Sequence, residues 1–313
     1  MTANILSLNM PPDRQIIEDI AIEMGVHPSF VEKDWFAVRL IELLTAFPAG
    51  AIKPVFSGGT CLSKAYGIIQ RFSEDVDFRG LSTGENRAER REFREAVLQA
   101  IRDHEDFDIA EVVSQDESRY FKADLFYPQH FTMASGLRPH LLLEFKLGMD
   151  VMRPVQQGRI QSFVSRYGGV SDGVTVDCVD PLEIAADKFS ALLWRVLNRD
   201  RNAENDDPAM IRHLHDLAHL YTAHIQPEGA AFSAAVHALY EADMRRGSIP
   251  ASTVAETAGQ VLSILQEDAA YQDEYGSFVD GMSYFLLLGV FWPRPPRPSH
   301  GSDDVLRYPA VNI

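Results

Sequence analysis

The sequence predicts a mixed α/β domain followed by an all-helical domain. Between residues 53 and 179, short segments with the two-residue period of β-strands alternate with helical segments. From Asp180 onwards the apolar residues recur with helical spacing only. We therefore expect a first domain at residues 1–179, with helices at its start, and a C-terminal helical domain at residues 180–313.

The composition is that of a globular protein without a membrane span. The 313 residues are 46% hydrophobic, and the longest apolar run, residues 284–292, is too short to cross a bilayer. The N-terminus lacks the basic segment and apolar core of a signal peptide, so we expect a cytoplasmic protein with no membrane partner. Cys61 and Cys178 are too few for a disulfide framework, and both are expected in the core.

The charge balance limits how the chain can bind nucleic acid. With 45 acidic and 29 basic residues the formal charge is -16, so any polyanion must bind at a local basic patch. One candidate is the helix predicted after residue 82, where four arginines lie opposite the apolar face: Arg87, Arg90, Arg91 and Arg94. Alternatively, interleaved glutamates pair with these arginines and the helix is only solvated.

The elements of the first domain follow from periodicity and from turn signals. Residues 13–46 have helical periodicity in two pieces, separated by the turn GVHP. The apolar strand in AIKPVFSGG ends at a glycine pair, and a helix from Thr60 to about Gln70 follows it. The segment SEDVDF then alternates as a strand does. Ser82 and Glu85 predict a capping box for the next helix. Four strands are expected between residues 119 and 179, in RYFKADLFY, HLLLEFKLG, RIQSFVSRY and VTVDCV.

The second domain contains two similar helix starts. Asp180 with Pro181, and Asp207 with Pro208, place an N-cap aspartate before a proline at the first helical position. Glu183 completes a capping box at the first of them. Later helices are expected at about residues 229–245, 251–266 and 275–290, before a proline-rich tail.

Two aspartates in the predicted strand SEDVDF suggest a metal site. Asp75 and Asp77 are two residues apart, so both carboxylates project from one face of the strand. Two like charges this close need a cation. A divalent ion with oxygen ligands, Mg²⁺ or Mn²⁺, would satisfy them and bridge to substrate phosphates.

The glycine pair suggests a phosphate-binding loop. Gly58 and Gly59 lie between a strand and a helix, where missing side chains let a phosphate approach backbone N–H groups. Ser57, Thr60 and Lys64 are further nucleotide-binding candidates. Alone, such a joint is more often a simple turn, and an aspartate pair is more often a solvated face.

The order of these motifs matches the polymerase β-like nucleotidyltransferase superfamily: strand, glycine pair, helix, then the aspartate pair after 15 intervening residues. That layout requires a third carboxylate on a neighbouring strand. Glu144 in LLLEFKLG is the candidate, because an acid among leucines is costly to bury unpaired. It would be the third metal ligand or the base that activates the acceptor. The alternative is an ion pair with Lys146.

The segment FSGGTCLSKAYGIIQRFSEDVDFR resembles two motifs, G-G-T-x-L-x-K and R-F-S-E-D-[IV]-D, of the AbiEii/AbiGii toxin family of nucleotidyltransferases. VEKDWFAVRLIELL upstream, and DKFSALLWR and RHLHDLAHL downstream, resemble further motifs of that family, so the resemblance spans residues 31–220. In the last motif His213 stands where many members have an aspartate, and Asp216 is kept. The resemblance makes Asp216 a candidate catalytic residue.

The resemblance implies a polymerase β-like nucleotidyltransferase core with a mixed sheet, followed by a helical domain. It also implies a metal-dependent enzyme that moves a nucleoside monophosphate from an NTP to an acceptor such as the 3' end of tRNA. Such an enzyme would be the toxin of a toxin–antitoxin or abortive-infection system, with a cognate antitoxin as partner. Transfer to a small molecule or protein, and a degenerate member that only binds nucleotide, are the alternatives.

The helical motifs supply candidate phosphate ligands. Lys188, Arg195 and Arg199 are spaced by seven and four residues, so they share a helix face and could grip a triphosphate. Lys188 is also a catalytic candidate. Arg212 is a further nucleotide-binding candidate, unless it forms an i,i+4 ion pair with Asp216. In HLHDLAH, the histidines at positions 215 and 219 allow a rival hypothesis of a metal-dependent phosphohydrolase, which would need ligands from other helices.

Overall fold

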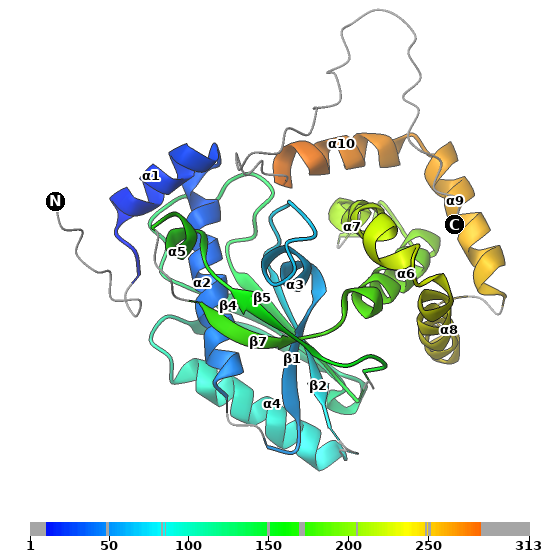
Figure 1. Cartoon of the computed structure of the whole chain (residues 1–313), viewed down its shortest axis with the longest axis horizontal. Helices are drawn as coiled ribbons and strands as arrows, with labels where there is room; N and C mark the ends of the chain where they lie inside the picture. The colour runs from blue at the N-terminus through cyan, green and yellow to red at the C-terminus, as the bar shows by residue number, and fades with distance from the viewer. Residues whose placement is uncertain are drawn as a thin grey trace, which may run out of the picture.

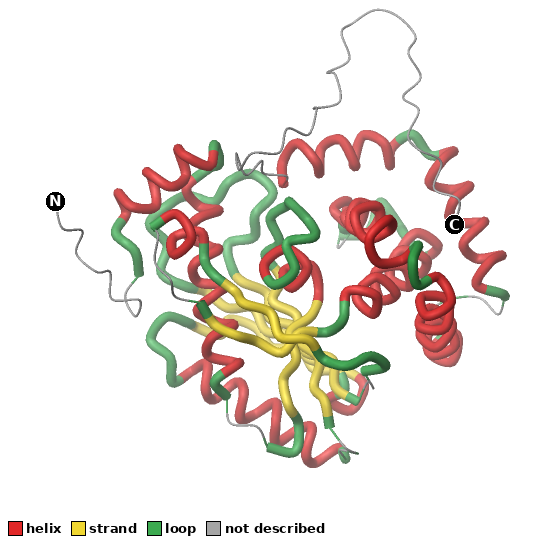
Figure 2. The backbone as a smooth tube through the Cα atoms, in the orientation of Figure 1, coloured by secondary structure: helices red, strands yellow, loops and turns green. Residues whose placement is uncertain are grey.

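The structure is a computed structural model that describes residues 11–282, except residues 48–49, 83, 85, 149–150, 169–172, 205, 248 and 250–251. A seven-stranded sheet lies at its centre (Figures 1 and 2). The strands are β1 (Lys53–Ser57), β2 (Asp75–Leu81), β3 (Asp108–Gln115), β4 (Tyr120–Phe126), β5 (Leu141–Leu147), β6 (Gln156–Ile160) and β7 (Val174–Cys178). Their order is β3-β4-β5-β2-β1-β7-β6. The pairs β2–β5 and β1–β7 are parallel and the other pairs antiparallel, which confirms the predicted mixed α/β fold.

The helices before β7 are α1 (Arg14–Met24), α2 (Pro28–Thr45), α3 (Gly58–Lys64), α4 (Arg87–Arg102) and α5 (Phe163–Tyr167). Those after it are α6 (Pro181–Leu197), α7 (Arg212–Leu220), α8 (Gly229–Arg246), α9 (Val254–Glu267) and α10 (Ala270–Met282). Short helical turns precede α7 (Pro208–Ile211) and follow it (Tyr221–Ile225). None of these described helices has the length and apolar character that a membrane span requires.

The two faces of the sheet differ in chemistry. On one face Phe78 and Phe121 both stack on Phe145, with ring centroids 5.2 and 4.9 Å away. Phe93 of α4 meets Phe145 edge-on at 5.4 Å. Because side chains alternate along a strand, the neighbouring polar positions of β2 and β5 point to the other face. That face is the one turned towards α6, α7 and α8, on the side opposite α4 (Figure 1).

The buried apolar residues form two clusters. The first lies between the sheet, α1, α2 and α4, and extends along the chain to Ala185, with Leu220 and Ile225 added. The second runs from Ala186 to Phe278 within the later helices. Cys61 and Cys178 are buried free thiols of the first cluster, as predicted. The division at residues 179 and 180 into two domains stays a prediction.

Several predicted elements differ from the observed ones. The N-cap of α4 is Asn86, which forms a capping box with Glu89, not Ser82; the predicted partner Glu85 lies outside the described residues. The segment predicted as one strand, RIQSFVSRY, leaves the sheet after Ile160 and forms α5, since the Ser162 side chain caps that helix. The edge strand β3 was not predicted, because most of its residues are exposed on both faces and show no clear alternation.

The helix starts of the second part are only partly as expected. Asp180 caps α6 through the Leu182 N–H, as predicted, but the Glu183 carboxylate accepts from Arg79 and from the Arg153 N–H and closes no capping box. Asp207 makes no capping bond with its side chain. Helices α8 and α9 confirm the predictions for residues 229–245 and 251–266. The last predicted helix corresponds to α10 up to residue 282, and the tail lies outside the described residues.

Candidate active site

The glycine pair and the aspartate pair meet where β1 joins α3. Ser57, the last residue of β1, is the register partner of Asp77 on β2. A Cβ atom at Gly58 would lie 1.9 Å from Asp77 Oδ2, and one at Gly59 would lie 2.8 Å from Arg71 Nη2. Gly58 also has a φ of +73°, which disfavours other residues. Glycine at position 58 therefore lets the backbone approach the Asp77 carboxylate, and glycine at position 59 makes room for the Arg71 side chain.

A cavity of about 1280 Å³ opens over this joint, between the sheet and the helices α6, α7 and α8. It brings together nine of the predicted site residues: Ser57, Gly58, Gly59, Asp75, Asp77, Glu144, Lys188, Arg195 and Arg212. Residues from strands and helices up to 155 positions apart thus face one space. Three predicted site residues do not line it: Thr60, Lys64 and Asp216.

Three carboxylates stand on the polar face of the sheet in this cavity. Glu144 of β5 is the direct register partner of Asp77, and Asp75 lies two residues before Asp77 on β2. Burial, together with the charges of Glu144 and Asp75, raises the pKa of Asp77 to about 8. Glu144 Oε1 accepts a hydrogen bond of 2.9 Å from the Tyr120 hydroxyl. The alternative ion pair between Glu144 and Lys146 is not formed.

A cation of the protein already contacts one of these carboxylates. Arg138 Nη1 lies 2.6 Å from Asp75 Oδ1, and the Arg138 N–H donates to Glu74 Oε2 at 3.1 Å. As the side chains stand, no three His, Cys, Asp or Glu residues in the described part of the chain are grouped to coordinate one ion. Arg138 was not among the predicted site residues, because the loop between β4 and β5 has no motif that shows which strand it will contact.

Asp216 is buried beneath the cavity and holds two cations. Its carboxylate accepts from Arg71 Nε and Nη2, each at 2.7 Å, and Lys188 Nζ lies 2.6 Å from Oδ2. Burial opposes ionisation of Asp216, but Lys188 and Arg71 outweigh it and hold the pKa of this carboxyl well below its usual range. Lys188 therefore spans from Asp216 to the cavity. Arg71 lines the cavity too and was missed, although it is the first residue of the motif RFSEDVD.

The remaining arginines of the helical motifs share other acids. Arg195 and Arg212 each place Nη1 2.9 Å from Asp207 Oδ2, so the alternative pair between Arg212 and Asp216 is not formed. Arg199 is tied to Asp206 and Glu274 and does not line the cavity. The positions of Arg195 and Arg212 in the cavity wall are compatible with phosphate binding.

His213, the residue that departs from the family pattern, also lines the cavity. Neither of its buried ring nitrogens has a hydrogen-bond partner within the described residues. Burial lowers the pKa of His213 well below its usual value, so a neutral imidazole faces the cavity. A neutral ring can donate one hydrogen bond and accept another.

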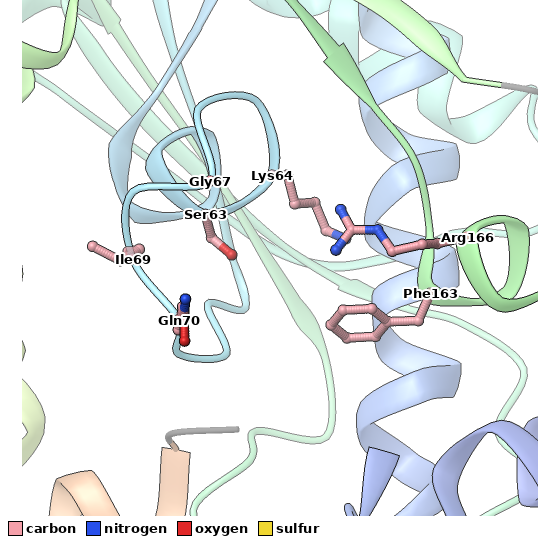
Figure 3. A pocket seen from close by; sticks show the side chains of 7 residues that line it. All are labelled: Ser63, Lys64, Gly67, Ile69, Gln70, Phe163 and Arg166. Atoms are coloured by element: carbon pink, nitrogen blue, oxygen red, sulfur yellow. The ribbon is translucent and has the colours of Figure 1, made fainter. Parts of the chain in front are cut away.

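Thr60 and Lys64 have structural partners away from the cavity. The Thr60 hydroxyl donates to the backbone carbonyl of Asp75. Lys64 forms a buried ion pair with Asp34 of α2, and its Nζ lies 4.8 Å from the centre of the Phe163 ring. This pair borders a separate pocket of about 100 Å³, which Lys64 and Arg166 both line (Figure 3). Their predicted contact with nucleotide has no support from their positions.

The charged residues of the upstream motif VEKDW also make structural contacts away from the cavity. Three consecutive buried charges on α2 each hold a distant segment. Glu32 accepts from the His130 N–H at 2.7 Å, Lys33 donates to the Arg138 carbonyl at 2.7 Å, and Asp34 accepts from the Phe163 N–H at 2.7 Å. The motif thus ties α2 to three segments that are distant in the sequence.

The rival histidine site is not supported by the geometry. His215 Nδ1 lies 3.2 Å from the Tyr275 hydroxyl, and His219 Nδ1 donates to the His215 carbonyl at 2.9 Å. No metal-binding group that includes them exists among the described residues. The arginine face of α4 is also partly engaged, since Arg90 is buried against Glu117 and Arg94 donates to Ser114 and Ser118.

Comparison with known proteins identifies the family. Among solved structures, the chain is similar to MenT4, the nucleotidyltransferase toxin Rv2826c from Mycobacterium tuberculosis H37Rv, with 14% identity and a TM-score of 0.36 over 79% of this chain and 98% of that chain. No curated protein matches the sequence. The family model described as nucleotidyl transferase AbiEii toxin, type IV TA system, matches residues 42–306. The chain therefore belongs to the AbiEii family of nucleotidyltransferase toxins of type IV toxin–antitoxin systems.

Proposed function

We propose that the protein transfers a nucleoside monophosphate from an NTP to the 3' hydroxyl of an RNA bound in the large cavity. The proposed substrate class is tRNA, and the reaction would use Mg²⁺ or Mn²⁺. The observation that supports this most is the close approach of Gly58 to Asp77 in a cavity that also contains Glu144 and Lys188. Glycines, paired carboxylates and a lysine are the groups that a phosphoryl-transfer site needs. We further propose a cytoplasmic toxin that a cognate antitoxin protein restrains.

The donor set fits a hard divalent cation. Asp75, Asp77 and Glu144 offer only oxygen ligands, and they lie on adjacent strands of one sheet face. Oxygen-only sites suit Mg²⁺ and Mn²⁺ better than zinc. When bound, the ion would neutralise the charge that develops on the transferred phosphate. Asp75 and Asp77 would hold it, with Glu144 as a third ligand or as the base.

Residues of the protein would bind the phosphates and accept the proton of the acceptor. The glycine backbone packs against the side chains of Asp77 and Arg71 at the cavity wall, where the phosphates would bind, and Lys188 would contact them as a point charge. Glu144, oriented by Tyr120, would accept the proton of the acceptor hydroxyl. The hydroxyl oxygen of the acceptor forms a bond to the α-phosphorus of the NTP. At the same time the bond between the α-phosphorus and the oxygen that bridges to the β-phosphate breaks, and pyrophosphate leaves.

The acceptor and nucleotide can be identified in one experiment. The purified protein is incubated with Mg²⁺ and each of the four NTPs, labelled at the α-phosphate, together with deacylated tRNA and, separately, with total cell protein. We expect label on the RNA with at least one NTP. Label on protein or on a small molecule alone would contradict the RNA acceptor, and no transfer under any condition would indicate a member that only binds nucleotide.

Lys188→Ala is expected to weaken NTP binding roughly tenfold or more, because a charge-assisted contact to phosphate contributes about 1.5–3 kcal/mol. Asp216 keeps its two hydrogen bonds to Arg71, so the buried carboxylate stays paired. Calorimetry with a non-hydrolysable NTP measures the effect. Lys53→Ala, at an exposed position outside the cavity, is the control. If Lys188→Ala and Lys53→Ala bind the NTP with equal affinity, Lys188 has only a structural role.

Arg138→Gln is expected to tighten binding of Mn²⁺ several-fold in the absence of nucleotide. The guanidinium contacts Asp75 Oδ1 directly and competes with an ion for that oxygen. The paramagnetic resonance signal of free Mn²⁺ gives the affinity without any catalytic assay. Arg119→Gln serves as control, because Arg119 pairs with Asp116 rather than with Asp75. An unchanged Mn²⁺ affinity in Arg138→Gln would show that Asp75 does not bind the ion.

A further inference from the structure

The cavity extends beyond the carboxylates, across β5 and β4 to the turn that follows β3. Its wall on this side contains Lys146 of β5, Tyr120 and Lys122 of β4, and Arg119. Lys122 is the register partner of Glu144, and Tyr120 is the partner of Lys146. Lys122 and Lys146 therefore flank Glu144 on the same face of the sheet.

These two lysines differ from the other cations of the cavity. Lys188 and Arg71 are paired with Asp216, and Arg195 and Arg212 are paired with Asp207. Lys122 and Lys146, in contrast, have no hydrogen-bond or ion-pair partner within the described part of the chain, and Lys146 is exposed. Lys146 is near enough to Asp77 and Asp187 for its charge to lower their pKa values, but neither lysine is held by a direct ion pair. In a protein of net charge -16, two lysines that are not held in ion pairs on one face of the cavity favour an anionic ligand.

The order of the strands indicates which of the two substrates Lys122 and Lys146 face. Gly58 lies on the β1 side of Asp77, and Glu144 lies on its β5 side, because β2 is between β1 and β5. Phosphoryl transfer places the attacking and leaving oxygens roughly in line, on opposite sides of the phosphorus. With the triphosphate at the glycines, the acceptor hydroxyl must approach over β5 and β4, where the lysines are.

We infer that Lys122 and Lys146 bind backbone phosphates of an RNA acceptor whose 3' hydroxyl lies at Glu144. This subsite rests on the proposed function and names the chemistry of its second substrate. The volume of about 1280 Å³ exceeds the 300–1000 Å³ that a small-molecule site usually occupies, so it accommodates the RNA end beside the NTP. A neutral acceptor would leave both lysines without a directly bound anion.

The test is a double variant, Lys122→Gln with Lys146→Gln, and a binding measurement. Fluorescence anisotropy of a labelled single-stranded RNA ending in CCA is followed against KCl concentration, with a non-hydrolysable NTP present. Each lost phosphate contact lowers the salt slope by about 0.7, so we expect a slope less steep by about 1.4 and a roughly tenfold weaker affinity at low salt. NTP binding by calorimetry should stay within about twofold of wild type.

Two further variants make the result specific. Lys122→Arg with Lys146→Arg keeps both charges and should restore RNA binding. Lys53→Gln removes an exposed lysine outside the cavity and should leave the slope unchanged. If the double glutamine variant keeps the wild-type slope while the wild-type protein labels RNA, the subsite is wrong and the proposed function stands. If wild-type protein binds NTP but neither binds nor labels RNA, both the RNA acceptor and this subsite fail.

Discussion

Replacing Asp77 by asparagine is expected to lower nucleotidyl transfer by about a thousandfold or more while the protein remains folded. The substitution removes the charge that the metal ion needs, which is a loss of about 4 kcal/mol of transition-state stabilisation. It changes little volume, and it relieves a buried carboxylate of repulsion from Glu144 and Asp75. Asp75→Asn should have the same effect on transfer.

Measurements of the transfer rate and of the stability distinguish the loss of a metal ligand from misfolding of the variant. Single-turnover transfer at saturating Mg²⁺ gives the rate, and calorimetric unfolding in EDTA gives the stability. We expect the melting temperature of Asp77→Asn to equal or exceed that of the wild type. Wild-type turnover in either variant would rule out the metal assignment.

Asp216→Ala is expected to destabilise the fold by about 3–5 kcal/mol, the usual cost of removing one partner from a buried ion pair. Arg71 and Lys188 would both keep a buried charge without a counter-ion, since Asp216 is fully buried between them. Urea unfolding of the two proteins measures the difference. As the control, Glu241→Ala removes an exposed ion pair with Arg245 and should cost no more than about 1 kcal/mol.

This result decides the role of Asp216. The family resemblance made it a catalytic candidate, but its carboxylate lies beneath the cavity and positions Arg71 and Lys188. An Asp216→Ala protein that is as stable as wild type and yet inactive would contradict the positioning role and would favour direct contact with substrate.

Local patterns were sufficient to predict that the paired carboxylates, Glu144 and the glycine pair lie together. The alternation in SEDVDF required Asp75 and Asp77 to share a face, and the apolar strand around Glu144 required a partner for its charge. Both features depend on strand geometry alone. The cavity accordingly contains Asp75, Asp77 and Glu144 together with the glycine pair.

Residues whose role depends on tertiary contact could not be predicted in the same way. Arg71 and Asp216 are 145 positions apart, and Arg138 reaches Asp75 from a loop. Lys64 follows the glycine pair at a spacing that suits phosphate binding, but α3 turns its side chain towards Asp34 of α2. Sequence spacing shows which side chains share a face of one element, but not which other element packs there.

The elements that were mispredicted also reflect competing local signals. Apolar residues in RIQSFVSRY fit a strand, but the Ser162 hydroxyl caps a helix and the Phe163 N–H finds Asp34. Ser82 and Glu85 fit the capping-box pattern, and Asn86 and Glu89 fit it equally well four residues later. The sequence alone does not indicate which of two adjacent capping boxes forms.

The central claim is that this cavity performs nucleotidyl transfer, and the position of the transferred label tests it most directly. Wild-type protein and Asp77→Asn are incubated with Mg²⁺, deacylated tRNA and one NTP, labelled either at the α-phosphate or at the γ-phosphate. The account predicts that wild type attaches the α-label to RNA, releases the γ-label as pyrophosphate, and that Asp77→Asn does neither. Attachment of the γ-label, or equal transfer by Asp77→Asn, would contradict it.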